Sequence, residues 1–348
     1  MHMADALISP AVGGTAWAAT AGLIGYSSRK LRDGMEDRRI PLMAVLGAFI
    51  FAAQMINFTI PATGSSGHLG GGLILAILLG PYAGFLTLAS VLVIQALFFA
   101  DGGLLALGCN IVNLGLFTCY VAYPLVFRPL AGASPTRGRL TGAALVAAVF
   151  GLTLGALAVV VETTFSGVSQ LPFGPFALVM VPIHAAIGVV EGIVTAGVVL
   201  FVWRARPDLL RLWDSSSAHG SLRALLITFA AVAVVLGAVV SRFASTQPDG
   251  LEWSLGRVAG TEAPAGPERS LRGLLTRLQK RTAILPDYSL RSAAENPSAE
   301  GSWPAPDAGA SLSGVLGAGL TLLVALGAGY GLHRARSRNR ADPPTRTS

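Results

Sequence analysis

Eight stretches of this chain approach the length and apolarity needed to cross a lipid bilayer, and they constrain its fold more than any other feature. In lipid every backbone polar group needs an internal partner, so such stretches fold as helices, and a helix needs about 20 apolar residues to span the hydrocarbon layer. The composition agrees, because 53% of the 348 residues are hydrophobic and 12% are charged. We therefore predict an all-α integral membrane protein. The stretches are 8–28, 41–60, 81–100, 103–127, 140–163, 176–203, 222–241 and 311–332.

Basic residues indicate which ends of these helices face the cytoplasm. They occupy the connections at residues 29–39, 128–139 and 204–211, and they follow the last apolar stretch at 334–340. Because positive residues are enriched in cytoplasmic loops, we predict a multi-pass protein of the inner (plasma) membrane with its N-terminus outside and its C-terminus in the cytoplasm. The net charge of +7 is spread over short segments rather than gathered on one soluble domain, which argues against a nucleic-acid partner.

This topology requires an odd number of crossings between residue 68 and the basic segment at 128–139, where only two full-length stretches are visible. The short run LGGGLILAILLG, residues 69–80, supplies the missing crossing as a thin helix of about 18 Å that ends at Gly80-Pro81. A helix this short needs protein around it. The expected units are a seven-helix domain at 1–205, a cytoplasmic linker at 206–221, two further helices flanking an extracytoplasmic segment at 222–333, and a basic cytoplasmic tail at 334–348.

The first residues, MHMADALISP, place a histidine where it can bind a metal ion together with the main chain. The amine of Met1, the backbone nitrogen of His2 and Nδ1 of His2 can close two adjacent chelate rings around one ion. Planar nitrogen sets of this kind suit Ni(II) or Cu(II). His68, in the glycine-rich run GSSGHLGGG, is predicted to lie on the same side of the membrane and is the candidate for the fourth nitrogen. The alternative stays open: His2 as an incidental terminal residue and His68 as an ordinary loop histidine.

Polar side chains inside the apolar stretches are costly in lipid and are often functional. Gln95, Asn110 and Asn113 are the candidates to hydrogen-bond the second nitrogen of a metal-ligating imidazole. Asp101 is expected to cap a helix rather than to bind a metal ion. The remaining polar residues are expected to form hydrogen bonds between helices that hold the bundle together. They are Gln54, Asn57, His184 and Glu191.

The segment RSLRGLLTRLQKR, residues 269–281, has the leucine spacing of an amphipathic helix. Three placements are open: on a membrane surface, packed on the first domain, or as a small surface helix. Its apolar stripe consists of Leu271, Leu274, Leu275 and Leu278.

Several of these runs resemble a known family of metal transporters. MHMADALISP, TIPATGSSGHLGGGLILAILLGPYAGF, VIQALFFADGGLLALGCNIVNLG and IHAAIGVVEGIVT are similar in order and spacing to the CbiM/NikM family, over residues 1–205. QPDGLEWS and LPDYSL resemble the PDGLE domain, the CbiN/NikN-type accessory component, over residues 222–333. The chain departs from many relatives at residues 3–6, where it reads MADA. That departure concerns the packing of the N-terminal segment rather than the ligands.

The resemblance implies the substrate-binding (S) component of an energy-coupling-factor (ECF) transporter for cobalt or nickel, with a seven-helix bundle. It implies Met1, His2 and His68 as the metal ligands. It also implies that a transmembrane coupling (T) subunit and ABC-type ATPase subunits supply the energy, since this chain contains no G-x-x-x-x-G-K-[ST] nucleotide loop. Ni²⁺ or Co²⁺ is then the transported substrate, and the choice between the two stays open.

Two other classes of function remain as alternatives. One is an intramembrane enzyme that uses Glu162, His184 and Glu191, although no known catalytic signature surrounds these residues. The other is a metal sensor or assembly protein that does not transport, with the long extracytoplasmic segment as its working part.

Overall fold

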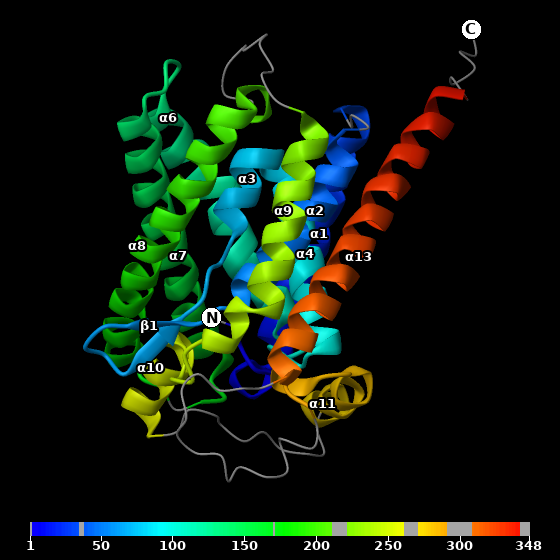
Figure 1. Cartoon of the computed structure of the whole chain (residues 1–348). Coiled ribbons are helices and arrows are strands. Elements are labelled where there is room, and N and C mark those ends of the chain that lie inside the picture. The colour runs from blue at the N-terminus through cyan, green and yellow to red at the C-terminus, as the bar shows by residue number, and fades with distance from the viewer. Residues whose placement is uncertain are drawn as a thin grey trace, which may run out of the picture.

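The computed structural model describes residues 2–34, 38–169, 171–210, 221–260, 271–290 and 308–341, and helices dominate it (Figure 1). The predicted all-α fold is confirmed, apart from one small hairpin. The longer helices in the first part are α1 (Pro10–Gly34), α2 (Arg39–Gln54), α3 (Gly72–Leu79), α4 (Pro81–Phe98), α7 (Arg137–Ser166) and α8 (Phe173–Ala205). The second part contains α9 (Leu222–Ala238), α10 (Gly250–Ala259), α11 (Leu271–Thr282) and α13 (Ala308–Ala341).

Between α4 and α7 runs one continuous helix of mixed geometry. It begins as α5 (Leu107–Ile111), widens into the π-helical segment η2 (Val112–Phe127) and ends as α6 (Arg128–Ala131). Pro124 lies inside it, and proline removes a backbone donor from the helical ladder. The short turns of the chain are η1 (Asp5–Leu7), η3 (Pro207–Leu210), η4 (Val240–Phe243) and η5 (Pro286–Tyr288).

Five helices in the described part of the chain are long and apolar enough to cross a membrane. They are α4, the continuous helix Leu107–Ala131, α7, α8 and the Ala308–Ala335 part of α13. The apolar helices α2 and α9 are shorter, with 16 and 17 residues. The chain is therefore a membrane protein, and the larger number of crossings expected from the sequence stays a prediction.

The short helix expected at residues 69–80 is present as α3 and is buried along its whole length. It begins after Gly71, which has φ 74°, and it ends at Gly80, which has φ 85°. Pro81 then starts α4. Positive φ favours glycine, so these two glycines allow a short helix to turn into and out of the bundle. Protein surrounds α3, as the sequence predicted for a helix too short to face lipid alone.

The second apolar stretch is shorter than predicted. Helix α2 ends at Gln54 rather than at residue 60, because the chain then forms strand β1 (Phe58–Ile60), which pairs antiparallel with β2 (Ser65–Gly67). Ala62 and Gly64, with φ 63° and 76°, make the turn between the strands. This hairpin lies at the end of the bundle where the N-terminus lies (Figure 1), and His68 directly follows its second strand.

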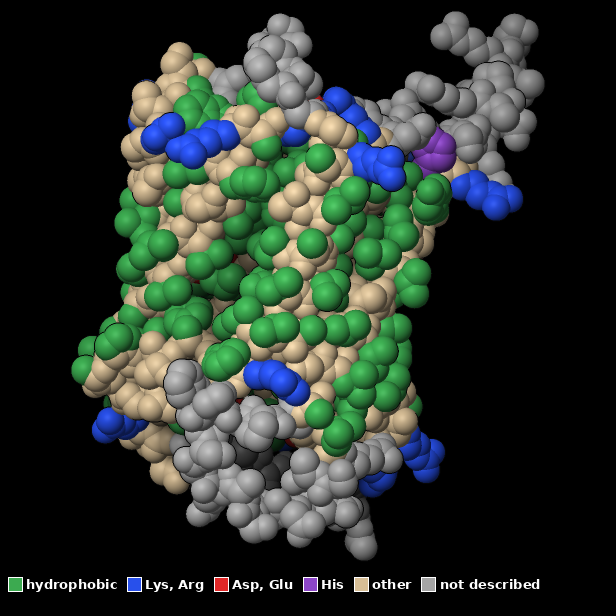
Figure 2. Space-filling view, in the orientation of Figure 1, with side chains coloured by type: hydrophobic (Ala, Val, Ile, Leu, Met, Phe, Trp, Pro, Cys, Tyr) green, Lys and Arg blue, Asp and Glu red, His purple; other side chains and the backbone are tan. Residues whose placement is uncertain are grey.

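The two ends of the molecule differ in what they carry. The N-terminus, β1, α10 and α11 lie at one end, and α6 and the end of α13 lie at the other (Figure 1). Hydrophobic side chains cover the middle of the visible face, while Lys and Arg side chains lie near both ends (Figure 2). This distribution suits a chain whose middle faces lipid.

The two parts of the chain pack against each other through α2. Phe49 of α2 and Phe229 of α9 have ring centroids 5.2 Å apart. Gly317 of α13 lies against the ring of Phe51, where a Cβ would lie 1.9 Å from the ring. Small residues allow such close helix contacts in membranes. The second part is thus docked on the first rather than joined to it only through the linker.

The domain boundaries of the sequence analysis stay predictions. Helix α13 continues to Ala341, so the predicted tail from residue 334 begins as helix, and a turn at Pro207–Leu210 lies in the predicted linker. Residues 211–220 and 342–348 lie outside the described residues.

Candidate metal centre

His2 and His68 come together at the N-terminal end of the bundle. Their rings are stacked, with centroids 4.9 Å apart and an angle of 5° between the planes. Their side chains are 7% and 9% exposed. The two histidines singled out by the sequence are therefore neighbours in a nearly dry site, although they are 66 positions apart in the chain. Met1, the third predicted ligand, lies outside the described residues.

The start of the chain is held inside the bundle by hydrogen bonds to its main chain. The amide of Met3 donates to Oδ1 of Asn110 at 2.8 Å, and Nδ2 of Asn110 donates back to the carbonyl of Met3 at 3.3 Å. Oδ1 of Asp5 accepts from the amides of Leu105 and Ala106 at 2.7 and 3.0 Å. The Met3 side chain is fully buried. These contacts fix the position of the backbone on the C-terminal side of His2.

His68 has the protonation pattern that a metal ligand needs. Its Nδ1 lies 3.1 Å from the carbonyl oxygen of Leu69, which can only accept, so Nδ1 donates and Nε2 carries the lone pair. Burial lowers the pKa of His68 to about 3, so the ring is neutral at physiological pH. A neutral imidazole with a fixed tautomer is the form that binds metal ions.

His2 is oriented by an acid that the sequence analysis assigned to another role. Its Nδ1 lies 3.2 Å from Oδ1 of Asp101, and Oδ2 of Asp101 accepts a hydrogen bond from the hydroxyl of Tyr288 at 2.5 Å. Burial alone raises the pKa of Asp101, but the contacts with His2 and Tyr288 outweigh it and hold the pKa below its usual range. The predicted helix cap is wrong, because Ala106 occupies the N-cap of α5.

This contact bears directly on the predicted ligand set. Chelation through Nδ1 of His2 requires that nitrogen to leave Asp101. Among the described residues, Nε2 of His2 is buried and has no hydrogen-bond partner. In the described residues the imidazole of His2 therefore has a polar partner at Nδ1 only, and one contact has to break for Nδ1 to bind an ion.

A second acid, Asp249, reaches the site from the other half of the chain. Its Oδ2 lies 4.0 Å from Nε2 of His68. Asp249 also caps α10 in a capping box with Glu252, and the amide of Ser66 donates to the carbonyl of Pro248 at 2.8 Å. The segment at residues 248–250 is therefore bound to β2, the strand that ends just before His68. The D-x-x-E spacing predicts the helix start, but only the tertiary structure shows that the capping acid faces a histidine.

Glu191 holds the loop on the other side of His68. Its carboxylate accepts from the amide of Gly70 at 2.7 Å and from the amide of Gly71 at 3.0 Å, just before α3 begins. Glu191 is completely buried. We expected it to bond another helix, and that is wrong: it binds the loop that follows His68. A carboxylate at a helix N-terminus is favoured by the helix dipole, so this contact fixes where the loop ends.

The other buried polar residues have separate partners. Gln95 donates to Gln54 at 2.9 Å and so links α4 to α2, as predicted for bundle-holding bonds. Asn113 donates to Glu162 at 2.7 Å. His184 contacts the carbonyl of Met180 on its own helix at 2.8 Å, which differs from the expected bond between helices.

These contacts bear on two of the predictions. The hydrogen bonds that the structure gives to Gln95, Asn110 and Asn113 go to groups other than an imidazole. Glu162, His184 and Glu191 each bond to a different segment of the chain. The constellation suggested for an intramembrane enzyme thus has no shared hydrogen-bond network in the described residues.

The two histidines border a cavity of about 340 Å³ that also reaches Asp101, Asp249 and Tyr288. The described residues contain no group of three or more His, Cys, Asp or Glu side chains arranged to hold a metal ion. The predicted set differs in kind, because two of its four nitrogens belong to the main chain. Planar nitrogen donors of this type suit d⁸ and d⁹ ions.

Comparisons with known proteins identify the family of both parts of the chain. Residues 2–209 match the family described as CbiM, cobalt uptake substrate-specific transmembrane region, and residues 223–334 match the PDGLE domain. The fused nickel transport protein NikMN of Rhodobacter capsulatus is 32% identical, covering 83% of this chain and 88% of that protein. A relative in Archaeoglobus fulgidus, named for the same fused nickel transport function, is 39% identical, covering 67% of this chain and 75% of its own length. The crystal structure of a truncated transition metal transporter superposes with a TM-score of 0.52 at 27% identity, covering 59% of this chain and 99% of that one.

Proposed function

Because this chain belongs to the CbiM family of cobalt uptake transmembrane regions, with a PDGLE domain fused to it, we propose that it captures Ni²⁺ or Co²⁺ on the outer side of the inner membrane through a planar nitrogen site at its N-terminus. The chain is a nickel or cobalt transport component. The single observation that carries the finer proposal is the stacked pair His2 and His68, buried where the N-terminal segment enters the bundle. The ligands are the amine of Met1, the backbone nitrogen and Nδ1 of His2, and Nε2 of His68.

This ligand set accounts for selection among metal ions. Four nitrogens in a plane replace the water shell of an ion that accepts planar coordination. Zn²⁺ prefers tetrahedral sites, and Mg²⁺ and Ca²⁺ prefer oxygen ligands. These ions therefore gain less from the site than Ni²⁺ does. Nickel fits the planar set better than cobalt, and the relatives named for fused nickel transport support the same choice.

Energy for transport comes from partner proteins in this proposal. The chain acts as the S component of an ECF transporter, with a T subunit and ABC-type ATPases that drive release of the ion into the cytoplasm. The absence of a nucleotide loop in the sequence supports separate ATPases. The N-terminus then lies outside the cell and the C-terminus inside.

The PDGLE half orders the metal site in this proposal. Two of its residues support this role: Asp249 lies beside His68, and Tyr288 holds Asp101 against His2. The amide of Asp287 also donates to the carbonyl of Phe99 at 2.8 Å, which ties this half to the loop that carries Asp101. Both histidines thus have an oriented acidic neighbour, and such partners typically change metal affinity about 10–100-fold.

The test is a titration of the purified full chain, with an unblocked N-terminus, with Ni²⁺. Binding is monitored through the absorption bands of Ni²⁺ in planar coordination. His2→Ala and His68→Ala should each abolish the planar spectrum and weaken binding at least about 100-fold. An added residue ahead of Met1 should have the same effect, because it moves the amine away from the chelate. His333→Ala is the matched control, because His333 lies near the C-terminal end of α13, at the opposite end of the molecule from His2 and His68 (Figure 1). Unchanged binding in the extended chain would exclude the N-terminal site while leaving transport by another site open.

A further inference from the structure

A second cavity, larger than the one between the histidines, opens beside His2 at the same end of the molecule. Its volume is about 640 Å³. A metal ion with six waters occupies about 180 Å³, since each water takes up about 30 Å³. The cavity therefore exceeds a hydrated ion more than threefold and falls in the range of about 300–1,000 Å³ that holds small organic molecules.

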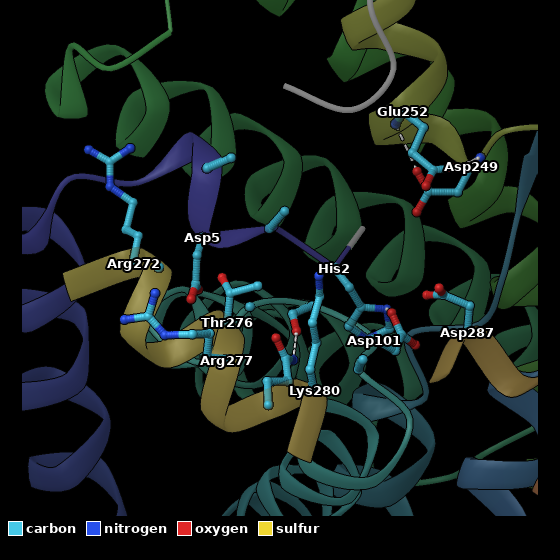
Figure 3. A pocket seen from close by; sticks show the side chains of 17 residues that line it. His2, Asp5, Asp101, Asp249, Glu252, Arg272, Thr276, Arg277, Lys280 and Asp287 are labelled. Atoms are coloured by element: carbon cyan, nitrogen blue, oxygen red, sulfur yellow. Dashed lines mark hydrogen bonds and ion pairs between the residues drawn. The ribbon is translucent and has the colours of Figure 1, made fainter. Parts of the chain in front are cut away.

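Most of the charged residues of this cavity are separated by sign, and Asp5 is the exception, because this acid lies on the same side as Arg272 (Figure 3). His2 lies between the two groups, next to Asp101. Acidic side chains form the side toward α10 and η5, and basic side chains on α11 form the opposite side. The acidic group consists of Asp101, Asp249, Glu252 and Asp287, and the basic group consists of Arg272, Arg277 and Lys280.

Helix α11 turns its basic face toward the cavity instead of burying its leucines. Leu271, Leu274 and Leu278 are 49%, 56% and 49% exposed. The helix is held in place by Gln279, whose Nε2 donates to the carbonyl of Ala96 at 2.9 Å and to a second carbonyl on the loop beside Asp101. A helix anchored by one glutamine, with its apolar stripe outward, presents the basic residues to the cavity at fixed positions.

Polar atoms on this wall lack partners within the described part of the chain. Nε and Nη1 of Arg272 are buried without a hydrogen bond, and so is Oδ2 of Asp5, which also borders the cavity. Nε2 of the nearly buried His2 is in the same condition. A buried polar group without a partner costs about 1–3 kcal/mol, and more when it is charged. Such groups around one cavity indicate a ligand that brings both acceptors and a cation.

We infer that this cavity receives the metal ion as a complex with a small polycarboxylate, which docks its carboxylates on Arg272 and Lys280 while the ion faces His2. This inference rests on the proposed function, because the ion then moves to the nitrogen site. Guanidinium groups bind carboxylates through paired, charge-assisted hydrogen bonds. Metal–oxygen bonds of the complex break as metal–nitrogen bonds form, the proton displaced from the backbone nitrogen of His2 passes to a freed carboxylate, and the ligand leaves with it. The basic wall thereby holds the anion where the acidic wall would repel it.

Transfer kinetics of the purified full chain test this inference with nickel citrate as the probe. The rate of planar site formation should rise with the concentration of the complex and then saturate, because the complex docks before the ion is exchanged. Arg272→Gln combined with Lys280→Gln should slow transfer from nickel citrate about tenfold and leave capture of Ni²⁺ alone undiminished. Arg281→Gln is the matched control for each single substitution, Arg272→Gln or Lys280→Gln, since it also removes one positive charge from α11 but at a position that does not line the cavity.

Three results would overturn the inference. The first is a transfer rate that equals the rate at which citrate spontaneously releases nickel and that is the same in all variants. This result would mean that the complex does not dock before the ion is exchanged. An equal loss in Arg281→Gln reduces the effect to general charge. Inhibition of transfer by inorganic phosphate as strong as that by metal-free citrate means that the wall attracts any anion, as it would a lipid phosphate. Loss of Ni²⁺ binding in His2→Ala is measured separately. The nitrogen site and the docking of the complex on Arg272 and Lys280 are therefore tested independently.

Discussion

Substituting Asp249 by Asn isolates the charge that the PDGLE half places beside His68. Asn is as good an N-cap as Asp, so α10 keeps its start while the negative charge is lost. The bound ion carries a net charge of +1 once the amide of His2 is deprotonated. The structure gives 4.0 Å between Oδ2 of Asp249 and Nε2 of His68. For an ion at that same distance from the carboxylate, Coulomb's law with an effective dielectric constant of about 20 gives about 4 kcal/mol, or roughly 1,000-fold in affinity. Screening reduces this, and we expect a loss of about 10–100-fold.

Spectroscopic titration with Ni²⁺ measures this loss, and thermal unfolding of the metal-free protein separates it from damage to the fold. Asp249→Ala should lose about 1 kcal/mol of stability in addition, because the cap disappears with the charge. Glu252→Gln is the control: it removes a neighbouring charge from the same capping box, and we expect less than about a threefold change. If Asp249→Asn binds Ni²⁺ as tightly as the unaltered chain, the carboxylate does not act on the bound ion and the reasoning fails.

Three further predictions concern neighbours of the histidines. Glu191→Ala leaves two buried glycine amides without an acceptor, at a cost of about 1–3 kcal/mol each. It should lower the melting temperature and weaken Ni²⁺ binding. Thr195→Val, one turn along the same buried helix face, is the control and should not weaken binding. Tyr288→Phe removes the hydroxyl that holds Asp101 against His2, so the acid competes less for Nδ1 of His2 and Ni²⁺ binding should tighten up to about tenfold in the same titration; weaker binding would contradict this. The unfolded chain protonates His68 near pH 6.5 and the folded chain only near pH 3, so the free energy of unfolding should fall as the pH drops through this window, by at most about 1.4 kcal/mol per unit. Thermal unfolding of the metal-free protein should show a smaller pH dependence after His68→Asn.

The sequence predicts the fold where apolar length decides it. Helices α4, α7 and α8 lie where the hydropathy places them, and the topology argument correctly requires the short helix α3. It misses the end of α2, because residues 55–60 are apolar enough to continue a helix and only the pairing of β1 with β2 draws them into a hairpin. A strand of three residues has too little pattern to be recognised from sequence.

The candidate site is predictable to the same degree. Glycine-flanked His68 and the terminal position of His2 stand out because their chemistry is local to the chain. Asp249 and Tyr288 do not, because their role depends on the docking of a half that begins more than 150 residues later. Asp101 was assigned to a helix cap on local grounds, and the tertiary contact with His2 overrides that preference. Local rules thus identify candidate ligands, while the groups that contact them depend on the packing of the two halves.

In the proposed site, the two acids beside the histidines would act on the ion in opposite senses. Asp249 faces Nε2 of His68, the nitrogen that a bound ion uses, so its charge adds to the affinity of the loaded site. Asp101 contacts Nδ1 of His2, the nitrogen that the ion must take over, so it favours the empty site. A site with only the first acid would hold the ion too tightly to release it, since every 1.4 kcal/mol is a factor of about ten in affinity. Because Tyr288 and Asp249 both belong to the PDGLE half, the packing of that half on the first part sets both contacts together.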